Sequence, residues 1–186
     1  MQHRYSLRAV ALCGALVAGC SDTTPTAPSE TTEKIALAKE GRVKRIQMMD
    51  ACDPASFDAV LGAGSCSRAG GITFDKFIEL LGRHQVAGSW HFSPSIVNVQ
   101  VGQELLAINS GGEVHTFTEV EEFGGGFVPD LNALSGNLVP APECLALDPD
   151  DFVPPGGTYS DEVEEEGEEL YQCCIHPWMR ARIHAH

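Results

Sequence analysis

The sequence YQCCIHPWMR, residues 171–180, is the strongest structural signal in this chain of 186 residues. Within it Cys173, His176 and Met179 stand three residues apart, so one strand end and one tight loop can deliver a thiolate, an imidazole and a thioether to a single ion. Pro177 stiffens that loop because its ring fixes the backbone. Soft sulfur together with imidazole nitrogen suits copper in both of its oxidation states. The stretch therefore predicts a copper site at the end of a strand.

A fourth donor is expected well upstream, and His115 in NSGGEVHTF (residues 109–117) is the candidate. The run FSPSIVNVQVGQEL (residues 92–105) precedes it, and Asn109 stands six residues before the histidine. This order resembles the plastocyanin-like cupredoxins, and the Cys-x2-His-Pro-x-Met ending is closest to amicyanin. The resemblance covers residues 89–186.

The resemblance implies a mainly β fold, a Greek-key β-sandwich of the cupredoxin type, with one type 1 copper per chain. His115, His176 and Cys173 would bind the copper in a plane, with Met179 as a long axial ligand. Asn109 resembles the asparagine that braces the ligand loop in this family. The imidazole of His176 would offer an exposed edge for the electron.

The chain pattern supports a β domain preceded by helices. Short β-type runs broken by Gly, Pro and Asn follow Trp90, at 96–101, 104–109, 114–120, 168–174 and 180–184. Such spacing argues for an antiparallel sandwich or barrel. Upstream, an apolar repeat at i, i+3, i+4 and i+7 over residues 74–81, after a cap at Thr73, predicts a helix. We therefore expect a short helical extension over residues 42–88 and the cupredoxin domain over residues 89–186.

Five cysteines remain once Cys13 and Cys20 of the N-terminal segment are set aside, and an odd number indicates two disulfides and one thiol with another use. With Cys173 on copper, strand alternation would turn Cys174 the other way. It could then pin the long segment between His115 and Cys173 through Cys144.

That pairing leaves Cys52 with Cys66. Four cysteines allow three pairings, so the scheme is one of several. A rival joins Cys173 to Cys174 in a strained vicinal disulfide, which would remove the thiolate and with it the copper site.

Residues 1–19 have the basic start and short apolar run of an export signal. They end in a lipobox at Leu16–Cys20, which predicts lipid on Cys20; plain secretion with a leftover thiol is the alternative. Residues 20–41 are rich in Ser, Thr and Pro and predict a flexible tether. The sequence thus predicts an exported lipoprotein, anchored to a membrane and facing the periplasm or the cell exterior.

The charge is strongly acidic, with 26 acidic and 12 basic side chains, and removal of the signal, which holds Arg4 and Arg8 but no acid, takes the net charge from −14 to −16. Nucleic acid is excluded as a partner by this balance. A basic redox protein such as a c-type cytochrome is favoured, with acids at 164–166 as a docking patch. We expect a one-electron carrier, not an enzyme; the alternatives are copper delivery or storage without a redox partner, and an interaction module without metal.

Overall fold

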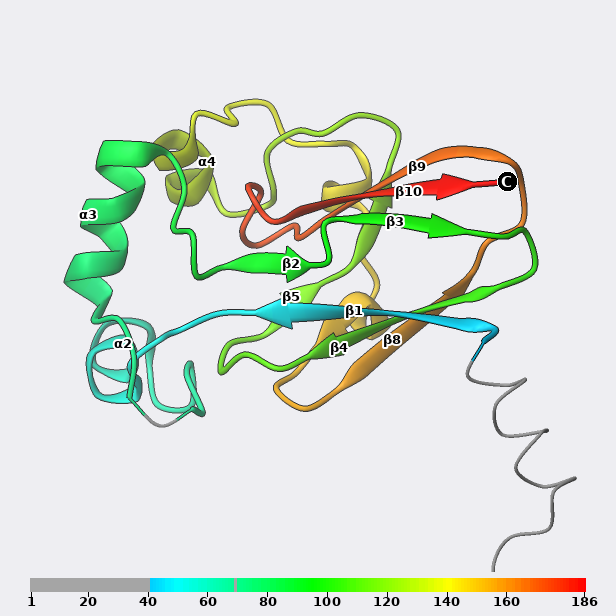
Figure 1. Ribbon diagram of the computed structural model, residues 1–186. Coiled ribbons are helices and arrows are strands. Elements are labelled where there is room, and N and C mark those ends of the chain that lie inside the picture. Colours follow the sequence, from blue (N-terminus) through cyan, green and yellow to red (C-terminus); the bar gives the residue numbers. More distant parts are fainter. Residues whose placement is uncertain (1–40, 69) are drawn as a thin grey trace, which may run out of the picture.

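The computed structural model describes residues 41–68 and 70–186 (Figure 1). The predicted signal peptide, the lipidation site Cys20 and the tether up to residue 40 lie outside the described residues. The strands are β1 (Val43–Met49), β2 (His91–Ser93), β3 (Ile96–Val99), β4 (Glu104–Asn109), β5 (His115–Thr116), β6 (Thr118–Val120), β7 (Phe152–Val153), β8 (Thr158–Glu162), β9 (Gly167–Gln172) and β10 (Arg180–Ala185). The helices are α2 (Pro54–Leu61), α3 (Phe74–His84), α4 (Pro129–Ser135) and two 3-10 turns, η1 (Glu143–Leu145) and η2 (Pro149–Asp151).

Two four-stranded sheets form the body of the protein. One has the strand order β2-β1-β4-β8 and the other β3-β10-β9-β6, while β5 and β7 form a small ribbon. Both large sheets are mixed, because β1 runs parallel to β4 and β3 runs parallel to β10, whereas the other pairs are antiparallel. The predicted mainly β sandwich is confirmed by this arrangement.

The sequence makes these strands because apolar and polar residues alternate with the period of an extended chain. In β10, Ala181, Ile183 and Ala185 are buried, while the residues between them are exposed or half-buried. In β4, Leu105, Ala107 and Asn109 are buried in the same alternation. Each strand therefore turns one face toward a core and the other outward.

Aromatic rings join the two sheets in that core. Phe117, between β5 and β6, stacks on Tyr171 of β9 with ring centroids 4.4 Å apart. The same ring meets Phe92 of β2 edge-on at 5.2 Å. Ile46 of β1 and Ile183 of β10 are fully buried in the same cluster. Burying a side chain of this size stabilises a fold by roughly 1.5–3 kcal/mol.

The helices gather at one end of the sandwich. Thr73 caps α3 by accepting a hydrogen bond from the Lys76 N–H at 3.4 Å, and Phe77 and Leu81 are its buried face. The helix predicted over residues 74–81 is thus confirmed. Figure 1 shows α2, α3 and α4 at the end where β9 turns into β10, whereas β8 turns into β9 at the opposite end. None of the described helices combines the length and apolar character that crossing a membrane requires.

The expected helical extension over residues 42–88 is wrong in its first part. Residues 43–49 form β1, which lies between β2 and β4 and is therefore an interior strand of the sandwich. Its register pairs Val43 with Glu104 and Met48 with Asn109. Only the later part of that segment forms helices, so the sandwich does not begin at residue 89.

Two disulfides join the cysteines in the pairing predicted by the scheme above. Cys52 is bonded to Cys66 with Cα atoms 6.1 Å apart, and Cys144 is bonded to Cys174 with Cα atoms 5.2 Å apart. Both spacings lie in the usual range for disulfides. Cys173 keeps a free, buried thiol, so the rival vicinal disulfide is absent.

Candidate metal centre

Three of the four predicted donor residues, His115, Cys173 and His176, meet at the helical end of the sandwich, and Met179 lies in the same loop as two of them. His115 begins β5, Cys173 follows β9 directly, and His176 and Met179 lie in the loop that leads to β10. The loop is closed by its backbone, since the Cys173 N–H donates to the Met179 carbonyl at 3.0 Å and the Met179 N–H donates to the His176 carbonyl at 2.9 Å. The exposed fraction of all four residues is 2% or less. A strand end and a tight loop thus deliver the donors to one buried place.

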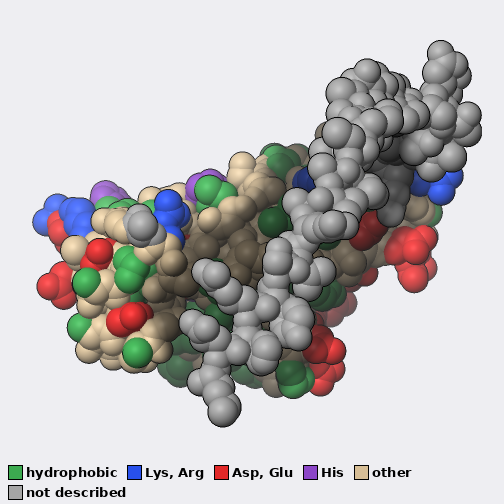
Figure 2. All heavy atoms as spheres, turned by 90° about the horizontal axis from the view of Figure 1, so that it is seen from below, with side chains coloured by type: hydrophobic (Ala, Val, Ile, Leu, Met, Phe, Trp, Pro, Cys, Tyr) green, Lys and Arg blue, Asp and Glu red, His purple; other side chains and the backbone are tan. Residues whose placement is uncertain are grey.

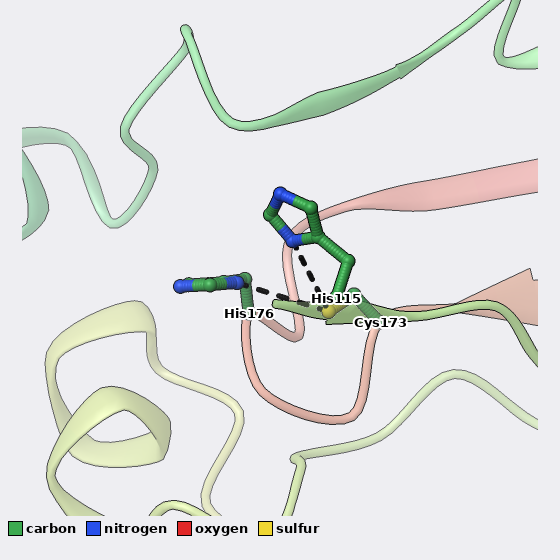
Figure 3. A group of neighbouring side chains, drawn as sticks. All are labelled: His115, Cys173 and His176. Atoms are coloured by element: carbon green, nitrogen blue, oxygen red, sulfur yellow. Dashed lines mark hydrogen bonds between the residues drawn. The ribbon is translucent and has the colours of Figure 1, made fainter. Parts of the chain in front are cut away.

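The sulfur of Cys173 faces one nitrogen of each histidine, as Figure 3 shows. Its Sγ lies 3.9 Å from Nδ1 of His115 and 3.7 Å from Nδ1 of His176. The two imidazole rings stand at 61° to each other with centroids 5.2 Å apart. Because both rings point the same nitrogen at the sulfur, the three atoms surround a common point.

The spacing of these atoms fits a metal ion. With bond lengths like those of zinc, about 2.3 Å to sulfur and about 2.0 Å to nitrogen, an ion holds the two atoms about 3.7 Å apart in a trigonal plane and about 3.5 Å apart in a tetrahedron. The observed distances of 3.7 and 3.9 Å match the trigonal arrangement better. A trigonal His2Cys set is typical of electron-transfer copper, so the chemistry of the donors fits that ion.

A buried carboxylate that the sequence analysis missed holds the other side of the His115 ring. Oδ2 of Asp50 lies 3.0 Å from Nε2 of His115, and neither side chain has any exposed surface. The same oxygen accepts the backbone N–H groups of Gly112 at 2.8 Å and Glu113 at 3.0 Å. Such a carboxylate fixes which ring nitrogen carries the proton and leaves Nδ1 for a metal.

These contacts set the protonation of the site. Burial opposes a charge on His115, but the hydrogen bonds with Asp50 and Cys173 outweigh burial and raise the pKa of His115 to about 9. Burial also opposes charge on Asp50, yet the bonds from His115 and two backbone N–H groups lower its pKa to about 2. For Cys173 burial is again outweighed, here by His115 and His176, and the pKa of the thiol falls well below its ordinary value. The protein thus favours the thiolate, which is the form that binds metals.

A second carboxylate lies behind His176. Oε2 of Glu113 is 3.6 Å from Nε2 of His176 and accepts a hydrogen bond of 2.6 Å from the indole N–H of Trp90. Burial raises the pKa of Glu113, although His176 and Trp90 lower it in part. Both imidazoles therefore have a carboxylate on the side away from the sulfur.

The expected exposed edge of His176 is wrong. The residue is 2% exposed, because Phe77 of α3 stands edge-on to its ring at 6.4 Å and Trp178 at 5.4 Å. Phe77 lies almost 100 residues from His176 in the sequence, so nothing local announced this contact. The helices cover the ligand loop instead of leaving it open to solvent.

Thr116 ties the two ligand segments together and was also missed. Its N–H donates to the Cys173 sulfur at 3.4 Å, and its Oγ1 accepts the Cys174 N–H at 2.8 Å. Asn109 is buried as a brace, but it supports the turn before His115: its Nδ2 donates to the carbonyls of Glu113 and Val153, both at 2.8 Å. The threonine next to the ligand, not the asparagine, contacts the cysteine strand.

Sequence signals for the missed residues were weak. Glu113 and Thr116 lie within two residues of His115 and could have been marked as its neighbours. Asp50 could have been found only if residues 43–49 had been read as a strand, since it then follows β1 at the same end of the sheet as the ligand turn.

Met179 is the remaining predicted ligand. Its side chain is fully buried and it closes the same loop as Cys173 and His176 through its backbone. These facts agree with an axial position, which stays a prediction.

No protein-family model and no curated protein matches the chain. Similar solved structures include a purple cupredoxin from Nitrosopumilus maritimus, at 15% identity and a TM-score of 0.41, over 76% of this chain and 98% of that one. An amicyanin variant in its Cu(I) form matches at 19% identity and a TM-score of 0.34, over 52% and 73%. A plastocyanin from Dryopteris crassirhizoma matches at 15% identity and a TM-score of 0.36, over 52% of this chain and 89% of that one. All three are cupredoxins, the family that the sequence resembles, but at these TM-scores the case for a metal depends on the donor atoms of this chain.

Proposed function

We propose that the protein binds one type 1 copper through His115, Cys173, His176 and Met179 and carries single electrons outside the cytoplasm. The observation that carries the proposal is the buried cluster of one thiolate and two imidazole Nδ1 atoms at trigonal spacing. Copper bound there supplies a one-electron couple. Four protein donors leave no position for a substrate, which favours a carrier over an enzyme.

The protein's part is to hold the donors still. Asp50 fixes the His115 ring from behind, and the Thr116 N–H donates to the sulfur. Backbone bonds close the loop that carries His176 and Met179. Since the donors cannot move far, the same arrangement serves both oxidation states, and little energy is spent on rearrangement when an electron moves.

The direct test is a titration of the metal-free protein with Cu(II), followed in the visible spectrum. We expect an intense thiolate-to-copper band at one copper per chain. Cys173→Ser should abolish the band, while the double variant Cys144→Ser/Cys174→Ser, which removes the neighbouring disulfide, should keep it. A band that persists in Cys173→Ser would reject the ligand assignment.

Copper delivery is the other candidate, and exchange separates the two. A carrier of electrons should keep its copper against an external chelator, while a delivery protein should release it readily. The burial of every predicted donor favours retention. Rapid loss of copper to a chelator, without reduction by any partner, would support delivery.

We also propose attachment to a membrane through lipid on Cys20. The two disulfides are typical of an oxidising compartment outside the cytoplasm, which agrees with export. Mass spectrometry of the N-terminal peptide from membranes should find the acyl chains on Cys20. Release of the protein into the soluble fraction by Cys20→Ala, with copper binding unchanged, would separate anchoring from the metal site.

The proposed redox partner is a basic protein such as a c-type cytochrome. Figure 2 shows Asp and Glu side chains at both ends of the face that it draws, including the end away from α2 and α3. Residues 164–166 lie at that end, between β8 and β9, and line an acidic hollow. The segment from Gly167 to Cys173 is about 20 Å long, at about 3.3 Å per residue. This length separates the acidic residues from the proposed copper ligands. The acids are therefore suited to steering an encounter at long range, not to contacting the partner beside the copper.

A further inference from the structure

A cavity of about 660 Å³ lies beside the ligand loop, between α2 and α3 on one side and α4 on the other. Phe57, Phe74 and Phe77 line the first wall, and Leu131 and Leu134 line the second. Its volume falls within the range of about 300–1,000 Å³ that is usual for small-molecule sites, which are mostly apolar with a few polar groups. The cavity is thus large enough to bury a molecule built on one ring.

The polar end of the cavity is formed by Glu113 and His176. In Figure 3 the His176 ring extends away from Cys173, so its Nε2 lies on the side remote from the sulfur. Oε2 of Glu113 is occupied by the Trp90 N–H. Among the described residues no hydrogen bond reaches the other oxygen, Oε1, although a carboxylate accepts at both. A residue that lines the apolar cavity therefore keeps an acceptor oxygen with no partner among the described residues.

The charges around the cavity have one sign. Of the described residues that line it, Glu113 and Asp130 are acidic and none is Lys or Arg. The faces of phenylalanine rings also attract cations, because the ring carries negative charge above and below its plane. A positively charged group would be stabilised here by the carboxylates and the rings together, and an anion would be repelled.

We propose that this cavity binds a small organic cation, an ammonium group carried on an apolar ring or short chain. The ammonium donates to Glu113, and the apolar body packs between the phenylalanines and α4. The apolar walls come mostly from helices that carry no copper ligand, whereas Glu113 and His176 place the cavity next to the proposed copper site. Binding can be measured with and without metal, and the two ideas can fail separately.

Three probes of nearly equal size test the proposal on the whole mature chain: phenethylammonium, 2-phenylethanol and phenylacetate. Calorimetry should show saturable binding of the ammonium and no binding of the carboxylate. The alcohol should bind about 10- to 100-fold more weakly, because it can still donate to the Glu113 carboxylate but carries no positive charge to pair with it. The same order should hold in metal-free Cys173→Ser. Equal affinity for ammonium and alcohol, or no binding of the ammonium, would overturn the proposal.

Variants locate the site. Glu113→Gln should remove the preference for the ammonium over the alcohol, and Leu134→Trp, which places a larger side chain in the cavity wall, should weaken the binding of both probes. Glu164→Gln, which removes one negative charge at the opposite end, should leave all affinities unchanged. Retained circular dichroism shows that each variant folds. If Glu113→Gln does not fold, Leu134→Trp and the probe series in the native protein still test the proposed site. Undiminished binding in Leu134→Trp would place the cation elsewhere and contradict the proposal.

Discussion

Replacing Asp50 by asparagine is expected to lower the affinity of the site for copper by about 10- to 100-fold, the usual cost of losing a group behind a metal ligand. Oδ2 of Asp50 bonds His115 and two backbone N–H groups, and Oδ1 accepts the Cys52 N–H at 3.2 Å. If the asparagine oxygen replaces Oδ2, its amide group opposes the Cys52 N–H. The hydrogen bond from His115 then goes to a neutral amide oxygen instead of a carboxylate, which costs about 1–1.5 kcal/mol. That loss is close to a tenfold decrease in copper affinity.

The assay is competition for copper against a chelator of known affinity, followed by the visible band at pH 7 and well below the melting temperature of each variant. Asp53→Asn is the matched control, because it makes the same change three residues away and asparagine also caps a helix. It should leave the copper affinity unchanged. An Asp50→Asn protein that binds copper as tightly as the native one would refute the role assigned to this carboxylate.

Replacing Cys144 and Cys174 by serine removes their disulfide and should lower the free energy of unfolding by about 3.6 kcal/mol in the chain-entropy picture, for a separation of 30 residues. Denaturant unfolding of the metal-free protein measures this loss, and an unchanged midpoint would contradict it. Burial and the nearby Asp161 raise the pKa of Glu119 above 4.5, so the native state holds a proton that the unfolded state has lost and stability falls as pH rises through that window. Glu119→Gln should therefore stabilise by about a few tenths of a kcal/mol at pH 7, since the group is partly exposed, and not at pH 4; equal gains at both pH values would count against this cause. Changing all three glutamates 164–166 to glutamine should slow association with a basic cytochrome at low salt and leave the rate at high salt unchanged. A deficit that persists at high salt in stopped-flow mixing would mean that the acids form the contact itself.

The ligand set could be predicted because its members are close in sequence or carry a strong local pattern. Cys173, His176 and Met179 lie within one loop, and His115 follows a strand that alternates clearly. The structure brings the first two and His115 together as expected. The strand at 43–49 could not be predicted, because Lys44, Arg45, Gln47 and the methionines are also good helix formers. Its extended form is set by pairing with β4, more than 50 residues away.

Two of the features missed at the site, the carboxylate of Asp50 and the cover by Phe77, have one origin, the folding of residues 50–84 over the ligand end of the sandwich. Asp50 reaches His115 from the end of β1, and Phe77 of α3 covers His176. Each contact spans more than 60 residues, so no local pattern carried it. The same segment decides how the site works. Because Asp50 and Phe77 help to bury the two imidazoles, an electron in the proposed function would pass through the helical cover or beside it, and the cavity lined by Phe77 and His176 gives a small molecule a place beside the proposed ligand loop.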